Sequence, residues 1–254
     1  MAAPAQRPLR MGEVLDRSFA LYRAEHATFR RILAMGILPA TALNFLAARL
    51  HALPALSGVE LGIPSLATPL PILLVQGLSA YIAFLMTAAL ALMTMGSVRE
   101  RPPSAWEAWR GALGRWRPLL AVGALEFVGM SIGFALLWIP GLVLLVYVSF
   151  TVQAVVLEGL STVAAWSESF ALLRTAFGRV TGVVAIAFGL VLGLTLVANV
   201  PVELLTRSIH GVALVGLSAL VTFVVDVLIG GFPAVCATVL YLDLRARAAA
   251  ADAL

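Results

Sequence analysis

Lysine is absent from this 254-residue sequence, and charged residues of any kind make up only 12% of it. Soluble domains carry about 25% charged residues and about 45–50% apolar ones. Here the hydrophobic share is 61%, the mean hydropathy is +1.01, and the net charge of +4 comes entirely from arginine. This composition excludes an ordinary soluble domain. It predicts an all-α integral membrane protein in which residues 1–254 form a single membrane domain.

Residues for disulfide, metal or cofactor chemistry are equally scarce. The one cysteine, Cys236, lies in an apolar segment, and a single thiol excludes an intramolecular disulfide. The three histidines show no spacing typical of a zinc site, and no P-loop or dinucleotide motif is present. We therefore expect no enzymatic activity and no cofactor. We also expect no nucleic-acid partner, because no soluble domain is predicted that would present the arginines. The first ten residues lack the apolar core of a signal peptide, so no cleavage is expected there.

Six segments are apolar and long enough to cross a bilayer, which takes about 20 helical residues. Each of them is expected to form one transmembrane helix. The six lie at roughly Ile32–Leu50, Ile72–Val98, Leu119–Trp138, Leu142–Leu157, Val180–Asn199 and Val212–Leu242.

Proline and glycine mark where these helices should bend or stop. Pro39 is expected to kink the first span, and the proline-rich residues 51–71 should form an irregular loop. Residues 139–141, Ile-Pro-Gly, leave room only for a tight turn between the third and fourth spans. A polar loop is expected at residues 200–211. Residues 230–233, Gly-Gly-Phe-Pro, predict a kink or break in the sixth span.

Three further segments have the periodicity of amphipathic helices, at residues 9–31, 102–117 and 162–178, with Ser104 as a suitable N-cap. Helices rich in arginine and tryptophan beside membrane segments are typical of the headgroup layer. Their expected interfacial anchors are Trp106, Trp109, Trp116, Trp166, Arg110 and Arg174. Packing inside the protein stays open as the alternative for the first helix and for the three tryptophans of the second.

The arginines predict the orientation. They cluster at the N-terminus, at residues 99–117, at residues 174–179 and at the C-terminus, whereas only Arg49 and Arg207 fall on the other side. Loops rich in arginine remain in the cytoplasm. We therefore expect both termini and all three amphipathic helices to be cytoplasmic, in a multi-pass protein of the bacterial cytoplasmic (inner) membrane.

An internal repeat accompanies this plan. Residues 18–23, Ser-Phe-Ala-Leu-Tyr-Arg, match residues 169–174, Ser-Phe-Ala-Leu-Leu-Arg, at five of six positions. Each match lies in an amphipathic segment that leads into a pair of spans. We expect three parallel units, at about residues 9–98, 102–158 and 161–245, each with one cytoplasmic amphipathic helix and one transmembrane hairpin.

Two stretches carry a family resemblance. PLRMGEVLDRSFALYR at residues 8–23 resembles the start of bacterial proteins related to the glycerophosphoryl diester phosphodiesterase membrane domain. IPGLVLLV, VVLEG and AAWSESFALLRTAFGRV, which begin at residues 139, 155 and 164, are similar to a second signature of that family. The resemblance implies six membrane helices and, for members without the soluble phosphodiesterase domain, no established activity. That enzyme domain is not expected here.

Glu126 and Asp226 are the candidate functional residues. Both fall inside predicted spans, where an ionisable side chain is unfavourable unless it faces the protein interior or a cavity. One hypothesis is that they line a shared polar cavity as a proton or cation site. The alternative is that each is neutral or hydrogen-bonded to a neighbouring helix, with no role in transport.

Other polar residues in the spans favour structural roles. The amides Asn44, Gln76, Gln153 and Asn199 are expected to form hydrogen bonds between helices rather than to bind ligands. Glu158 is expected to pair with Arg174 or Arg179 and so to fix the third amphipathic helix.

Two functions from different classes remain. The first is a non-enzymatic membrane module that acts through membrane lipids or a membrane or cytoplasmic protein partner. The second is a small transporter or permease subunit with an intramembrane acidic site. A polar cavity that reaches both acids would favour the transporter, whereas a solid apolar core with both acids hydrogen-bonded would favour the module. The sequence leaves the oligomeric state open.

Overall fold

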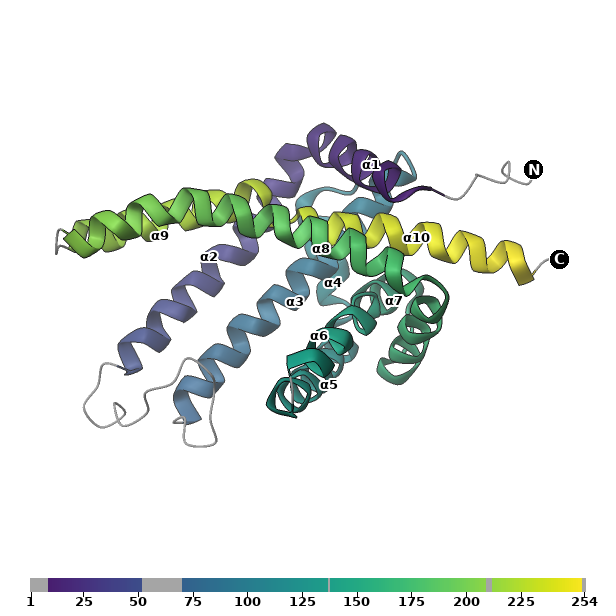
Figure 1. Cartoon of the computed structure of the whole chain (residues 1–254), viewed down its shortest axis with the longest axis horizontal. Coiled ribbons are helices and arrows are strands. Elements are labelled where there is room, and N and C mark those ends of the chain that lie inside the picture. Colours follow the sequence, from purple (N-terminus) through teal and green to yellow (C-terminus); the bar gives the residue numbers. More distant parts are fainter. Residues whose placement is uncertain (1–8, 52–69, 137, 209–211, 253–254) are drawn as a thin grey trace.

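The computed structural model describes residues 9–51, 70–136, 138–208 and 212–252, which are helical apart from short turns and connections (Figure 1). The helices are α1 (Met11–Ala24), α2 (His26–His51), α3 (Leu70–Val98), α4 (Ala105–Leu113), α5 (Trp116–Leu136), α6 (Trp138–Tyr147), α7 (Thr151–Glu158), α8 (Thr162–Ser208), α9 (Val212–Ile229) and α10 (Phe232–Asp252).

Six stretches of these described residues are long and apolar enough to cross a membrane. They are His26–Ala47, Leu70–Val98, Trp116–Leu136, Ile139–Glu158, Thr162–Pro201 and Leu220–Ala250. An all-α fold with six candidate spans is therefore confirmed.

The long helices form three hairpins that meet at one end. α2 lies beside α3, α5 beside α6, and α8 beside α9, and the third hairpin runs across the direction of the other two (Figure 1). The hairpins meet where α3 packs against both α7 and α10. α1 packs against α10, although the two helices lie at opposite ends of the chain. This contact completes the assembly.

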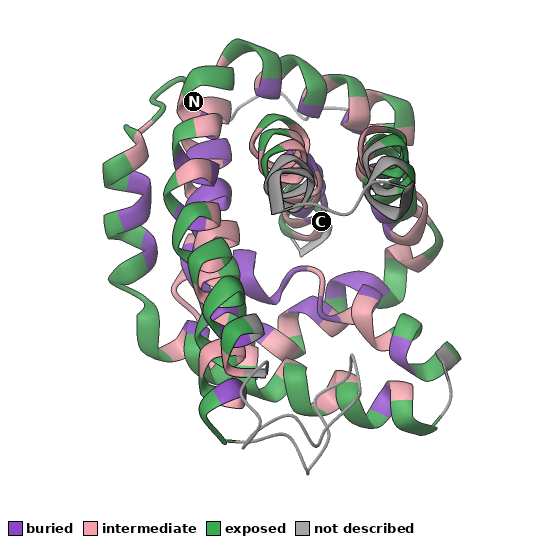
Figure 2. Cartoon of the chain, turned by 90° about the vertical axis from the view of Figure 1, so that its left-hand side faces the viewer, coloured by how far each residue is buried: buried purple, intermediate pink, exposed green. Residues whose placement is uncertain are grey.

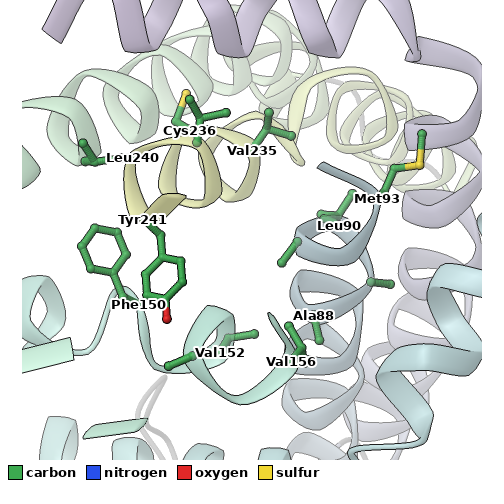
Figure 3. Packing of buried hydrophobic residues seen from close by; sticks show 14 of the residues in the cluster. Ala88, Leu90, Met93, Phe150, Val152, Val156, Val235, Cys236, Leu240 and Tyr241 are labelled. Atoms are coloured by element: carbon green, nitrogen blue, oxygen red, sulfur yellow. The ribbon is translucent and has the colours of Figure 1, made fainter. Parts of the chain in front are cut away.

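The buried core lies at this meeting point. Residues 88–91 of α3, 154–155 of α7 and 239–241 of α10 are almost fully buried there. The ring of Tyr241 lies 5.6 Å from that of Phe150, between α10 and the start of α7 (Figure 3). Toward the hairpin tips most side chains are exposed (Figure 2). Because the exposed residues there are largely apolar, a lipid environment suits them better than water.

Two predicted helix boundaries are wrong. The first amphipathic segment does not run to residue 31, because the backbone leaves the helical conformation at Glu25, between the end of α1 at Ala24 and the start of α2 at His26. Trp116 begins α5 instead of ending the second amphipathic helix, because α4 stops at Leu113, before a short turn.

The region of the fourth span also differs from the prediction. Ile139, Pro140 and Gly141 lie in the first turn of α6, where proline is tolerated because the first helical N–H groups have no partner within the helix. Gly133 of α5 and Gly141 approach closely: a Cβ on the first would lie 3.0 Å from the Cα of the second. The span itself is broken at residues 148–150, between α6 and α7.

The fifth span is longer than predicted. α8 continues through Pro201 to Ser208, so the expected polar loop at residues 200–208 is wrong. The Asn199 side chain stabilises this end of the hairpin, because its amide donates to Thr195 O at 3.0 Å and its oxygen accepts from Thr222 of α9 at 2.7 Å. At the other end, Ala176 has a non-helical backbone (φ −135°, ψ 18°), close to the predicted start of the span.

Other local predictions have mixed outcomes. The sixth span breaks at Gly230 and Gly231, between α9 and α10, as expected. Ser104 caps α4 in a reciprocal capping box: its Oγ accepts from Glu107 N at 3.3 Å, and the Glu107 carboxylate accepts from Ser104 N at 2.7 Å. α2 runs through Pro39. The predicted loop at residues 51–71 lies mostly outside the described residues.

Candidate functional site: a cavity at two helix breaks

A cavity of about 380 Å³ lies where both broken spans meet the rest of the bundle. Its walls come from α3, α5, α6 and α7, α8 and α10, and they include residues at each break: Val148 and Ser149 at the first, Gly230 at the second. Most of the lining is apolar, and the polar side chains are few and include those of Glu126 and Gln153. The volume falls within the range of about 300–1,000 Å³ that is usual for small-molecule sites.

Ser169 of α8 supports the first break. Its hydroxyl donates to Tyr147 O at 2.6 Å, the last carbonyl of α6, and accepts from Phe150 N at 3.3 Å, just before α7. Both backbone groups lose their helical partners at the break, and leaving them unpaired in a buried place would be unfavourable. The ring of Phe170, the next residue, stacks on Tyr147 with centroids 4.6 Å apart.

Tyr22 of α1 supports the second break. Its hydroxyl donates to Leu228 O at 2.9 Å, in the last turn of α9, and its ring packs on Phe232 at the start of α10. Burial raises the pKa of the Tyr22 phenol to about 12, so the hydroxyl keeps its proton and remains a donor. On the same helix, the buried Ser18 lies beside the thiol of Cys236, another residue of the cavity wall.

Glu126 brings a carboxyl group to the cavity from the middle of α5. The hydroxyl of Thr151, the first residue of α7, donates to this carboxyl and also contacts Val148 O at 2.8 Å. The break in the fourth span thus places a hydroxyl donor against an acid on a neighbouring helix.

Gln153 is the second polar group of interest. It is 1% exposed, it lines the cavity, and its side-chain oxygen has no hydrogen-bond partner among the described residues. A buried acceptor without a partner costs about 1–3 kcal/mol. The prediction that this amide serves only to join helices does not account for its free oxygen.

Asp226 lies apart from this constellation. It is partly exposed on α9, and it is not among the residues of the cavity wall, although its main-chain carbonyl accepts from Gly230 N at 2.8 Å at the break. The two predicted acids are therefore not brought together as lining residues of this cavity.

A charged cluster lies next to the core, at the end of α7. Glu158 accepts from Arg245 and from Tyr241, both on α10. Arg245 also binds Glu168 of α8 at 2.8 Å. The predicted partner of Glu158 is therefore wrong, because the nearby arginine comes from the C-terminal helix. The cluster nevertheless joins α7, α8 and α10.

A second charged cluster fixes the entry to α1. Asp243 of α10 pairs with Arg179 at 3.0 Å and with Arg247 at 2.8 Å, and it accepts from Leu9 N at 3.2 Å. Both arginines donate to Leu9 O. The segment before α1 is thus held by α8 and α10.

The predicted interfacial anchors differ in how exposed they are. Trp106 and Trp116 are about half exposed, and Arg110 lies over the Trp106 ring with its guanidinium carbon 5.6 Å from the centroid. Trp109 is buried, and its indole N–H donates to Ile32 O at 3.2 Å. The remaining two lie on α8: Trp166 is half-buried and stacks on Phe170, whereas Arg174 is exposed.

Sequence reasoning missed the residues that shape the cavity most. Neither Ser169 nor Tyr22 was predicted to touch a broken span, and Thr151 was not singled out at all. The repeated hexapeptide contains both Ser169 and Tyr22: Ser169 is the first residue of its second copy, and Tyr22 lies in its first copy. The repeat therefore marked this pair of residues without indicating what they contact.

Comparisons with known proteins do not extend this description. No family model, no curated protein and no solved structure matches the chain. The resemblance to the glycerophosphoryl diester phosphodiesterase membrane domain therefore stays a prediction.

Proposed function

We propose that this protein is a small membrane transporter or permease subunit that binds a solute in the cavity at Glu126. The observation that carries the proposal is that two discontinuous spans end at one cavity, and that this cavity holds a carboxyl group. Irregular backbone at membrane depth is tolerated where it is buried in protein or lines a cavity. Transporters commonly form solute sites from discontinuous helices near the middle of the membrane.

A comparison of two acid variants tests this function. The wild-type protein, Glu126→Gln and Asp226→Asn are each extracted in native lipid particles, and the co-purified small molecules are identified by mass spectrometry. We expect a near-stoichiometric molecule with wild type and Asp226→Asn, because Asp226 is not part of the cavity wall. The molecule should be lost with Glu126→Gln. The same molecules in equal amounts from all three proteins would contradict the proposal.

A non-enzymatic membrane module is the second candidate. It is favoured by the exposed tryptophans around α4, since Arg110 lies over Trp106 and Arg117 lies 5.2 Å over Trp116. Such pairs suit a headgroup layer or a partner surface. If a protein partner co-purifies at near-stoichiometric yield and survives Glu126→Gln but not Trp106→Ala, the module is the better description.

The proposal also includes the repeat units of the chain and its orientation in the membrane. We infer three parallel units at about residues 9–98, 102–158 and 161–245, with their amphipathic helices and both termini in the cytoplasm of a bacterium. The aligned serines support this, since Ser18 and Ser169 are both buried on helices that pack against a broken span. A cysteine at the exposed Ser167 should react with a membrane-impermeant thiol reagent only in inverted membrane vesicles. Reaction only in intact cells would reverse the orientation.

A further inference from the structure

The polar atoms of the cavity wall are suited to accept hydrogen bonds. Glu126 offers a carboxyl group, and the oxygen of the almost fully buried Gln153 has no partner among the described residues. Two hydroxyls of the wall already use their protons, because Thr87 donates to Ala83 O at 3.0 Å and Ser149 donates to Leu145 O at 2.9 Å. A hydroxyl that donates its proton still has lone pairs to offer. These oxygens favour a ligand that brings hydrogen-bond donors.

The charge of the wall favours a cation. Among the described residues that line the cavity, none has a basic side chain, and Glu126 has a hydroxyl rather than an arginine as its polar contact. An ionised carboxylate in such a place needs a positive partner from the ligand, or else a proton. Phe84 and Phe188 also line the cavity, and aromatic faces attract organic cations.

The remaining wall favours an apolar body behind the charged group. Met86, Met130, Leu145 and Val184 from four helices contribute to a lining that is mostly apolar. A volume of about 380 Å³ exceeds what a bare inorganic ion needs, and it suits a small organic molecule. The three N–H donors of a primary ammonium group match the carboxyl, the free amide oxygen and one hydroxyl.

We propose that the cavity binds a protonated organic amine with an apolar body, whose ammonium group lies between Glu126 and Gln153. The inference rests on the proposed solute-binding function and names its ligand class. Binding needs no covalent step. The ammonium group donates to the oxygens of the two side chains, and the apolar part of the ligand fills the rest of the cavity between the helices.

Cys236 supplies a reporter for this proposal, because it is the sole cysteine and lines the same cavity. The rate at which methyl methanethiosulfonate modifies it is followed by intact-protein mass spectrometry, on the full chain in lipid nanodiscs. The probes are n-octylammonium, n-octanoate and sodium ion, each added at matched concentration. We expect octylammonium to slow the modification several-fold, while octanoate and sodium leave it unchanged.

Three variants locate the effect. In Glu126→Gln and Gln153→Leu the apparent affinity for octylammonium should fall at least about tenfold, as loss of a charge-assisted hydrogen bond predicts. Asp226→Asn should behave as wild type. Gln153→Leu removes no charge, so it keeps the test valid if Glu126→Gln does not fold. Size-exclusion elution checks folding in each case.

The opposite results overturn the ligand class. Equal protection of Cys236 in all variants, protection by octanoate, or protection by sodium alone would each do so. The proposed function fails in a different way. A co-purified molecule that depends on Glu126 but is neutral or anionic would leave transport standing and remove only the amine, whereas the absence of any Glu126-dependent molecule would remove both.

Discussion

The two broken spans line the same cavity, but their breaks have different physical causes. The break between α9 and α10 falls at Gly230 and Gly231, so the local sequence itself disfavours a continuous helix there. The break between α6 and α7 contains neither glycine nor proline, and its free backbone groups bind Ser169, a residue of another helix. The break between α9 and α10 is thus encoded locally, whereas the break between α6 and α7 depends on tertiary contacts. Removal of the Ser169 side chain should therefore disturb the break between α6 and α7 more than the break between α9 and α10.

Ser169→Ala should have the largest effect, because it leaves Tyr147 O and Phe150 N without their shared partner. We expect a loss of about 2–6 kcal/mol in the free energy of unfolding, since each of the two unpaired buried groups costs about 1–3 kcal/mol. The midpoint of thermal unfolding in detergent should fall by several degrees. The exposed Ser167→Ala on the same helix is the control, with an expected change near zero. Equal stability of the two variants would contradict the bridging role of Ser169.

Gly230→Ala tests the locally encoded break. A Cβ at this position would lie 2.6 Å from Asp226 O, a backbone atom that cannot move away easily. At Gly231 the nearest atom is 3.1 Å away and belongs to the flexible Leu33 side chain. We expect Gly230→Ala to cost about 1–3 kcal/mol, as overpacking usually does, and Gly231→Ala to cost less. Thermal unfolding of the two variants side by side measures the difference, and the reverse order would be incompatible with this geometry.

Tyr22→Phe should be milder than either change. It removes one hydrogen bond to Leu228 O, worth about 1 kcal/mol, while the ring can still stack on Phe29 at 5.1 Å. Because Leu228 lies in the last turn before the break, the reactivity of Cys236 toward methyl methanethiosulfonate should also rise. Tyr81→Phe is the matched control, since its hydroxyl binds Trp116 O at 2.9 Å, outside either break. A similar rise in both variants would argue against a specific role for Tyr22.

Glu107→Gln should have the smallest effect and leave both breaks unchanged. The hydrogen bonds from Ser104 hold the pKa of the fully exposed Glu107 carboxyl below its usual value. A lowered folded-state pKa stabilises the protein above the ordinary carboxyl pKa, and this contribution is lost as the pH falls through the folded-state pKa. The unfolding midpoint of wild type should therefore drop slightly more than that of Glu107→Gln when the pH is lowered from 7 to 3. Cys236 reactivity should not change, and any change would show that α4 is coupled to the cavity.

The parts of the fold that were predictable have local causes. Apolar length predicts six spans, the Gly-Gly-Phe-Pro sequence predicts the break before α10, and Ser104 is correctly predicted as an N-cap. Each of these depends on residues within a few positions of one another, or on the composition of one segment.

The features that were not predicted depend on contacts between residues distant in the sequence. The break before α7 lies in an apolar run that reads as a continuous helix, and its support comes from Ser169, about 20 residues later. Glu158 pairs with Arg245 rather than with a nearer arginine because α10 folds back against α7. The free oxygen of Gln153 is a property of packing, so the sequence shows an amide there but not that it lacks a partner.

The most direct test of the account is a cryo-electron microscopy map of the full chain in lipid nanodiscs. It should show a break between α6 and α7 and a second between α9 and α10, with non-protein density between them that contacts Glu126. The same map of Glu126→Gln should retain both breaks and lose the density. A continuous fourth span with side chains filling the cavity would contradict the central claim that two helix breaks build one solute site.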